Sequence, residues 1–110
     1  MTEKEKIIND IIMHLKNEAS EESVSVYLFG SYGKDTYSEE SDVDLLLISK
    51  DPLLNINELV KKIYKKTVSL SKDMDILGYT YDEIKAKLTW SSFFNTIIQT
   101  GEVIYGKRIA

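Results

Sequence analysis

The stretch VSVYLFGSYGKDTYSEESDVDLLLI, residues 24–48, decides the fold of this chain. Its first six residues are rich in β-formers and stop at Gly30, which predicts a strand. The twelve residues from Gly30 onward hold two glycines and three serines and almost no aliphatic side chain, so they form a loop or a short turn of helix. The last seven residues are apolar on both faces, which predicts a central strand that begins with two carboxylates, Asp42 and Asp44.

Apolar periodicity and capping residues predict the remaining elements. A possible capping box at Thr2–Glu5 opens an amphipathic helix, Asn55 or Asn57 caps a second one, and a further box at Thr80–Glu83 opens a third. Helical spacing of apolar residues continues over residues 91–100 and ends at a glycine. The predicted strands are residues 24–29, 42–48, 74–79 and 102–105. The pattern is that of an α/β (α+β) fold, with helices packed on one small mixed β-sheet whose strand order the sequence does not set.

Composition excludes several classes of protein. The 110 residues are predicted to form one domain, residues 1–110, of ordinary globular composition. Fourteen basic against eighteen acidic residues give a net charge of −4, so direct nucleic-acid binding over a broad surface is not expected. With no cysteine and one histidine, the chain offers neither a thiolate nucleophile nor a zinc site. No long apolar run or signal-like start is present in the sequence, so a cytoplasmic protein without a membrane segment is expected.

The two carboxylates at the start of the central strand need a chemical explanation. Asp42 and Asp44 are two residues apart, so the pleat of a strand places them on one face. Close anions repel each other, and a site that keeps them charged is best understood as one that binds a cation. Mg²⁺ prefers oxygen ligands, takes one or two protein carboxylates, and completes its shell with water and substrate phosphates. The implied substrate is therefore a nucleotide.

Further positions in the sequence fit nucleotide chemistry. Gly30 and Ser31 close the first strand, where a residue without a side chain lets the backbone approach a phosphate and a hydroxyl can donate to it. Asp75 begins the third strand, and if that strand lies beside the second, its carboxylate can join the pair, so that three carboxylates hold two metals. Asp73 is the alternative third carboxylate if the register is shifted. Lys34 is a candidate phosphate contact in the same loop.

These residues form a recognisable pattern. Leu28-Phe29-Gly30-Ser31, ten residues, and then Asp42-Val43-Asp44-Leu45-Leu46 resemble the signature of the DNA polymerase β-type nucleotidyltransferase superfamily, and more narrowly of its minimal nucleotidyltransferases. The segment around Asp75 and the closing segment at residues 100–105 are similar to those of the family, so the resemblance covers most of the chain. It departs at Asp35, where family loops commonly carry a glycine, and this affects the loop shape and the charge near the phosphate.

The resemblance implies a polymerase β-like fold and specific roles. Gly30 and Ser31 would bind the triphosphate of ATP, Asp42 and Asp44 the metals of a two-metal Mg²⁺ site, and Asp75 the second metal together with the acceptor hydroxyl. The resemblance also implies transfer of AMP from ATP to an acceptor hydroxyl. The implied acceptor is a tyrosine of a small all-helical HEPN-type toxin, and the chain would be the antitoxin of that toxin.

Two alternatives remain open at the level of sequence. The first is a catalytically weak or inactive module that neutralises a partner by contact, for which Asp35 is the sequence support. The second is a nucleotidyltransferase for small molecules of the aminoglycoside type, which would work as a homo-oligomer.

Overall fold

Polar side chains fix the first turn of four helices in this computed structural model, which describes residues 1–109. Thr2 and Thr80 each form a capping box with the glutamate three residues on. Asn55, rather than the other asparagine that the sequence offers, and Ser91 each accept a hydrogen bond from the backbone amide three residues on. The predicted helix starts therefore lie where the capping residues place them.

All four strands predicted from the sequence are present in the structure. The segment expected to be a loop or a short helical turn begins with one turn of helix. In chain order the elements are α1 (Glu3–Lys16), β1 (Val24–Phe29), α2 (Gly30–Gly33), β2 (Val43–Ser49), α3 (Ile56–Lys66), the 3-10 turn η1 (Val68–Leu70), β3 (Met74–Thr80), α4 (Tyr81–Leu88), α5 (Ser92–Thr100) and β4 (Glu102–Tyr105). No helix within residues 1–109 has the length and apolarity needed to cross a bilayer.

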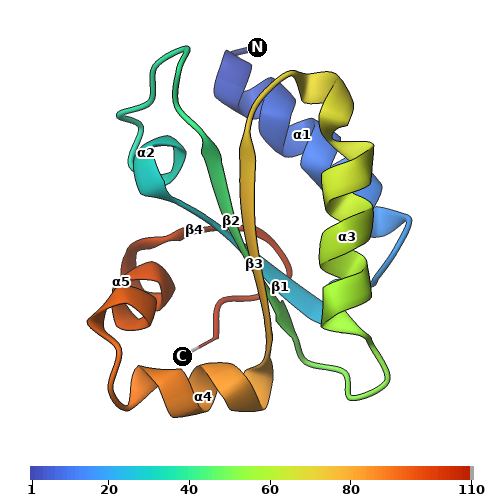
Figure 1. Cartoon of the computed structure of the whole chain (residues 1–110), viewed down its shortest axis with the longest axis vertical. Helices are drawn as coiled ribbons and strands as arrows, with labels where there is room; N and C mark the ends of the chain where they lie inside the picture. The colour runs from blue at the N-terminus through green and yellow to red at the C-terminus, as the bar shows by residue number, and fades with distance from the viewer. Residues whose placement is uncertain (110) are drawn as a thin grey trace.

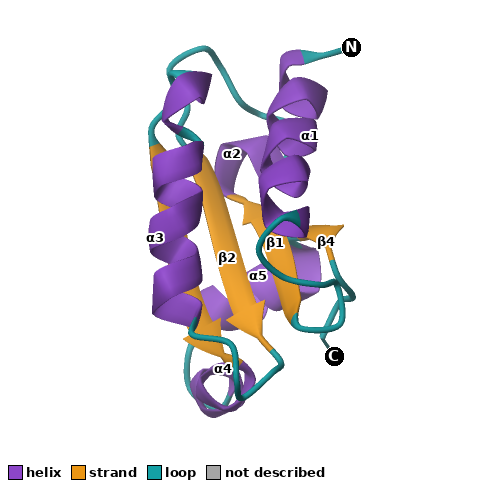
Figure 2. Cartoon of the chain, turned by 90° about the vertical axis from the view of Figure 1, so that its right-hand side faces the viewer, coloured by secondary structure: helices purple, strands orange, loops and turns teal. Residues whose placement is uncertain are grey.

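The four strands form one mixed sheet in the order β3-β2-β1-β4 (Figure 1). β2 runs parallel to β3 and antiparallel to β1, and β1 is also antiparallel to β4. Helices α1 and α3 cover one face of the sheet, and side chains of α4 and α5 pack on the other; in Figure 2, α5 lies behind the sheet and α4 is seen end-on below it. The fold is therefore a mixed α/β architecture, as the sequence predicts.

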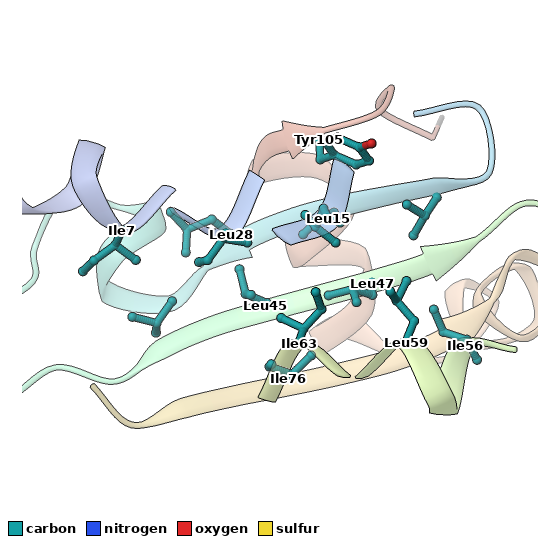
Figure 3. Close-up of a cluster of buried hydrophobic side chains, with 14 of the residues drawn as sticks. Ile7, Leu15, Leu28, Leu45, Leu47, Ile56, Leu59, Ile63, Ile76 and Tyr105 are labelled. Atoms are coloured by element: carbon teal, nitrogen blue, oxygen red, sulfur yellow. The ribbon is translucent and has the colours of Figure 1, made fainter. Parts of the chain in front are cut away.

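Side chains of the central strand β2 alternate between two separate cores. Leu45 and Leu47 belong to the larger apolar cluster beneath α1 and α3, which Figure 3 shows in close-up. Leu46 and Ile48 belong to a second cluster beneath α4 and α5. Asp44 has the parity of Leu46 and Ile48, so its carboxylate is directed to the α4–α5 face, at the end of the strand where that core gives way to solvent.

Strand β3 lies at one edge of the sheet and is held there by α3. The Ile76 amide donates a hydrogen bond to the Tyr64 hydroxyl at 2.8 Å, across the outer side of the strand. An edge strand has unpaired backbone groups on its outer side, and a side chain that occupies one of them protects the edge and fixes the strand. This contact involves the residue next to Asp75 and so helps to place it.

Candidate active site

Sheet pairing brings the predicted carboxylates of two strands to the same level. In the parallel pairing of β2 with β3, Asp44 is the direct partner of Asp75. Asp42 lies just before β2, two residues from Asp44 and exposed. Asp73 lies before β3, where its carbonyl accepts a hydrogen bond from the Val43 amide at 2.9 Å. The structure therefore places Asp75, not Asp73, opposite Asp44.

The electrostatics of Asp44 follow from this placement. Partial burial raises the pKa of the Asp44 carboxyl, and the negative charges of Asp75 and Asp42 raise it further. None of the ion pairs formed within residues 1–109 involves these three aspartates. Their mutual repulsion is thus not offset by a lysine or arginine of the described chain.

These carboxylates fit a cation that brings its own water and phosphate ligands. Within residues 1–109, no three acidic or histidine side chains are gathered closely enough to enclose an ion by themselves. Mg²⁺ does not need such a cage, because it is commonly held by one or two carboxylates and the substrate. Asp42 and Asp44, with Asp75 level with Asp44 on the next strand, would supply oxygen ligands and uncompensated negative charge for this ion.

Gly30 packs directly against the same carboxylate. It follows the last residue of β1, which pairs with Asp44, and its φ is +67°. A Cβ at this position would overlap Oδ2 of Asp44 and lie 3.0 Å from its Cγ. Glycine is therefore required both by the left-handed backbone and by the approach of the carboxylate. Gly30 of the predicted phosphate loop thus lies directly beside Asp44, one of the predicted metal ligands.

The rest of the loop is closed by its own backbone and borders a pocket. The Lys34 amide donates to the Gly30 carbonyl at 3.1 Å, and the Thr36 amide donates to the Ser31 carbonyl at 2.9 Å. Beside it lies a pocket of about 470 Å³ that Gly30 and Lys34 line together with Phe29 and residues of α5. The exposed Lys34 is thus placed next to Gly30 at the mouth of a cavity, as a phosphate contact requires.

The α5 wall of this pocket was not predicted as part of the site. Phe93 is 52% exposed, and its ring meets that of Phe29 edge to face with centroids 5.9 Å apart. Ser92, Thr96 and Thr100 line the same pocket. Their i, i+4, i+8 spacing was visible in the sequence as one polar stripe of a helix, but nothing in it indicated that the stripe faces the phosphate loop.

Asp35 adopts a backbone conformation that favours glycine. Its φ is +59°, in the left-handed region. Its carboxylate accepts a hydrogen bond from Lys4 Nζ at 2.7 Å, and Lys4 also pairs with Glu102 at 2.8 Å. Burial lowers the pKa of the Lys4 ammonium, but its hydrogen bonds to Asp35 and Glu102 raise the pKa by more, so the net shift is upward. The charge of Asp35 is thus matched by a lysine of α1.

Replacing Asp35 with glycine should stabilise the fold. Relief of the left-handed conformation is worth about 1 kcal/mol. The Asp35 side chain is 71% exposed, so loss of its ion pair costs a few tenths of that, and Lys4 keeps Glu102. We expect the free energy of unfolding in urea to rise by about 0.5–1 kcal/mol. Asp35→Asn, which removes the charge but tolerates the same φ, is the control; a loss of stability in Asp35→Gly would show that the ion pair dominates.

Comparisons with known proteins identify the family of this chain. The family model for the nucleotidyltransferase domain matches residues 10–100. The chain is 26% identical over 102 residues to a protein of Methanocaldococcus jannaschii named "Putative protein adenylyltransferase MJ0604", covering 93% of this chain and 98% of the relative.

Solved structures show the same fold. A toxin–antitoxin crystal structure with AMP-PNP matches with a TM-score of 0.61 and 24% identity, over 92% of this chain and 74% of that chain. The MntA–HepT toxin–antitoxin structure matches with a TM-score of 0.56 and 21% identity, over 94% and 73%. The chain that brings Gly30 against Asp44 and Asp44 beside Asp75 therefore belongs to the nucleotidyltransferase domain family.

Proposed function

We propose that this nucleotidyltransferase transfers AMP from ATP, with Mg²⁺, to the hydroxyl of a protein tyrosine, and that the acceptor belongs to a small all-helical HEPN-type toxin. In this proposal the chain is the antitoxin, and modification inactivates its partner. The name of the archaeal relative, a protein adenylyltransferase, supports the reaction class. The toxin–antitoxin structures that share the fold support the kind of partner.

One observation carries the proposal: Asp44 lies level with Asp75 on one side and against Gly30 on the other. A nucleotide bound at the phosphate loop would therefore place its phosphates next to Asp42 and Asp44. An acceptor hydroxyl beside Asp75 would then approach the same phosphates from the neighbouring strand. Two substrates held at adjacent positions in one site are what group transfer requires.

Each residue has a defined part in the transfer. The Ser31 hydroxyl and the Lys34 ammonium bind and orient the triphosphate, and Gly30 leaves room for it. Asp42 and Asp44 would hold Mg²⁺, which supplies neutralisation of phosphate charge when bound. Asp75 accepts a hydrogen bond from the acceptor hydroxyl and orients its oxygen toward the α-phosphorus. A new O–P bond forms to the tyrosine oxygen, the bond from the α-phosphorus to its bridging oxygen breaks, pyrophosphate leaves, and the hydroxyl proton passes to a carboxylate or to water.

The direct test is incubation of the purified protein with ATP, Mg²⁺ and the HEPN-type product of a neighbouring gene. We expect the intact mass of that product to rise by one or more AMP units. Asp42→Asn and Asp44→Asn should give no increase, because both remove a ligand of the proposed Mg²⁺ site. Fragmentation of the modified protein should place the AMP on a tyrosine.

Other outcomes would reassign the function. A tight complex without a mass increase would contradict transfer to this partner and favour neutralisation by contact. Transfer to a small-molecule hydroxyl with no partner protein present would favour the aminoglycoside-type activity. The carboxylate of Asp35, which was the sequence support for an inactive module, pairs with Lys4, so its negative charge near the phosphate loop is offset.

A further inference from the structure

Three side chains from distant parts of the chain meet behind the phosphate loop. The Tyr32 hydroxyl donates to Oε1 of Glu3 at 3.0 Å, and Lys72 Nζ lies 3.0 Å from the same oxygen. Lys72 Nζ also lies 5.6 Å from the centroid of the Tyr32 ring. The three residues come from the first turn of α1, from α2 and from the segment that enters β3. We call this group the brace.

The brace also holds the segment that connects the phosphate loop to β2. Lys72 Nζ donates to the Glu39 carbonyl at 2.6 Å. The ring of Tyr37 stacks on that of Tyr32, with centroids 4.4 Å apart and an interplanar angle of 8°. Lys72 therefore contacts, directly or through Tyr32, both ends of the connection between the phosphate loop and the carboxylates.

Burial makes these contacts specific rather than incidental. Tyr32 is 1% exposed and belongs to the core beneath α1 and α3, and the Lys72 side chain is 12% exposed. Hydrogen bonds from Lys72 and then Tyr32 hold the pKa of the Glu3 carboxyl below its usual range. The Glu3 carboxylate is thus charged at neutral pH, and it faces a lysine whose stem has little freedom to move.

The brace does not reach the substrate side of the sheet. Tyr32 packs into the α1–α3 core, whereas Asp44 is directed to the opposite face. In sequence, however, Tyr32 follows Ser31 directly, and Lys72 precedes Asp75 by three residues. Any effect of the brace on nucleotide binding must therefore act through the backbone of the loop and of β3.

We propose that Lys72 is a positioning residue that ties the phosphate loop to the start of β3, so that Gly30 and Ser31 keep a fixed place relative to Asp75. The proposal rests on the proposed function for its effect on the nucleotide, but the tie itself is a property of the free protein. Losing a supporting contact of this kind typically weakens a metal or substrate site about 10- to 100-fold.

The test compares three variants by two measurements. Lys72→Met keeps an apolar stem but removes the charge, and Lys72→Arg keeps the charge. Lys61→Met removes an exposed lysine of α3 whose one ion pair within residues 1–109 is with Glu58, at 3.6 Å. The first measurement is hydrogen–deuterium exchange of residues 30–42 in the free protein, with β2 as the internal reference for global stability. The second is the affinity for AMP-PNP in the presence of Mg²⁺.

We expect Lys72→Met to exchange residues 30–42 about tenfold faster while β2 is unchanged, and to bind AMP-PNP about tenfold more weakly. Lys72→Arg should stay within about threefold of the wild type in both, and Lys61→Met should equal it. Unchanged exchange in Lys72→Met, or faster exchange with unchanged affinity, would overturn the proposal. If the wild type does not bind AMP-PNP, the proposed function fails, and exchange alone decides whether the brace ties the loop.

Discussion

We expect Asp44→Asn to lower nucleotidyl transfer about a thousandfold without loss of the fold. That factor corresponds to roughly 4 kcal/mol of transition-state stabilisation, which is what removal of one central electrostatic contact typically costs. Asn keeps the shape of the side chain but not the charge that would hold Mg²⁺. The rate of pyrophosphate release under saturating ATP measures the effect.

The chain provides a matched control for this substitution. Asp73→Asn removes the same charge from an exposed residue that precedes β3 and is not level with Asp44. We expect its rate to stay within about twofold of the wild type, since isolated surface charges contribute little. An equal loss of rate in Asp44→Asn and Asp73→Asn would contradict the assignment of Asp75 and would favour Asp73 as the third carboxylate.

The stability of Asp44→Asn has a distinct pH dependence in metal-free protein. The raised pKa of Asp44 means that the folded chain holds its proton more tightly than the unfolded chain, whose carboxyl titrates near 3.8. The tighter binding of this proton stabilises the folded wild type fully below pH 3.8, and the stabilisation is lost as the pH rises through the raised pKa of Asp44. The variant should therefore gain stability relative to the wild type over that range, and Mg²⁺ at neutral pH should stabilise only the wild type.

Gly30→Ala should destabilise the protein by about 2–3 kcal/mol. The left-handed φ of +67° accounts for about 1 kcal/mol of this. The rest comes from the overlap of the new Cβ with the Asp44 carboxylate, which must move. Because that carboxylate is a proposed Mg²⁺ ligand, activity should fall together with stability. Urea unfolding monitored by circular dichroism gives the free energy directly.

A double-mutant cycle separates the two causes. In an Asp44→Ala background the carboxylate is absent, so Gly30→Ala should cost only the backbone strain of about 1 kcal/mol. A coupling energy near zero would mean that the carboxylate is not displaced by the methyl group. Such a result would contradict the close packing of Gly30 against the Asp44 carboxylate.

Elements of this fold could be predicted from sequence because their signals are local. The capping boxes at Thr2 and Thr80 and the apolar run after Asp44 each lie within a few residues, and the helices and strands follow them closely. The pairing of Asp44 with Asp75 could be stated only as a condition, because alternation shows which face a residue occupies and not which strand lies beside it.

The contacts that the sequence did not indicate are long-range and between polar residues. Glu3 meets Lys72 across 69 positions, and neither lies in a pattern that marks it as more than a surface charge. The positive φ of Asp35 could not be predicted either, because the sequence of a polar loop does not show which of its residues adopts that conformation. Such features are set by how the loop closes over the packed sheet, after the strand order is fixed.

Because successive side chains of β2 face opposite sides of the sheet, the activity of this enzyme depends on the correct register of that strand. A one-residue slip of the strand would turn Asp44 into the leucine-rich core beneath α1 and α3 and present Leu45 to the nucleotide instead. Misregistered molecules would thus be both unstable and inactive. The specific activity of a preparation would therefore depend on the fraction of chains in which β2 has the correct register. Circular dichroism, which measures secondary-structure content, would not distinguish these chains from misregistered ones.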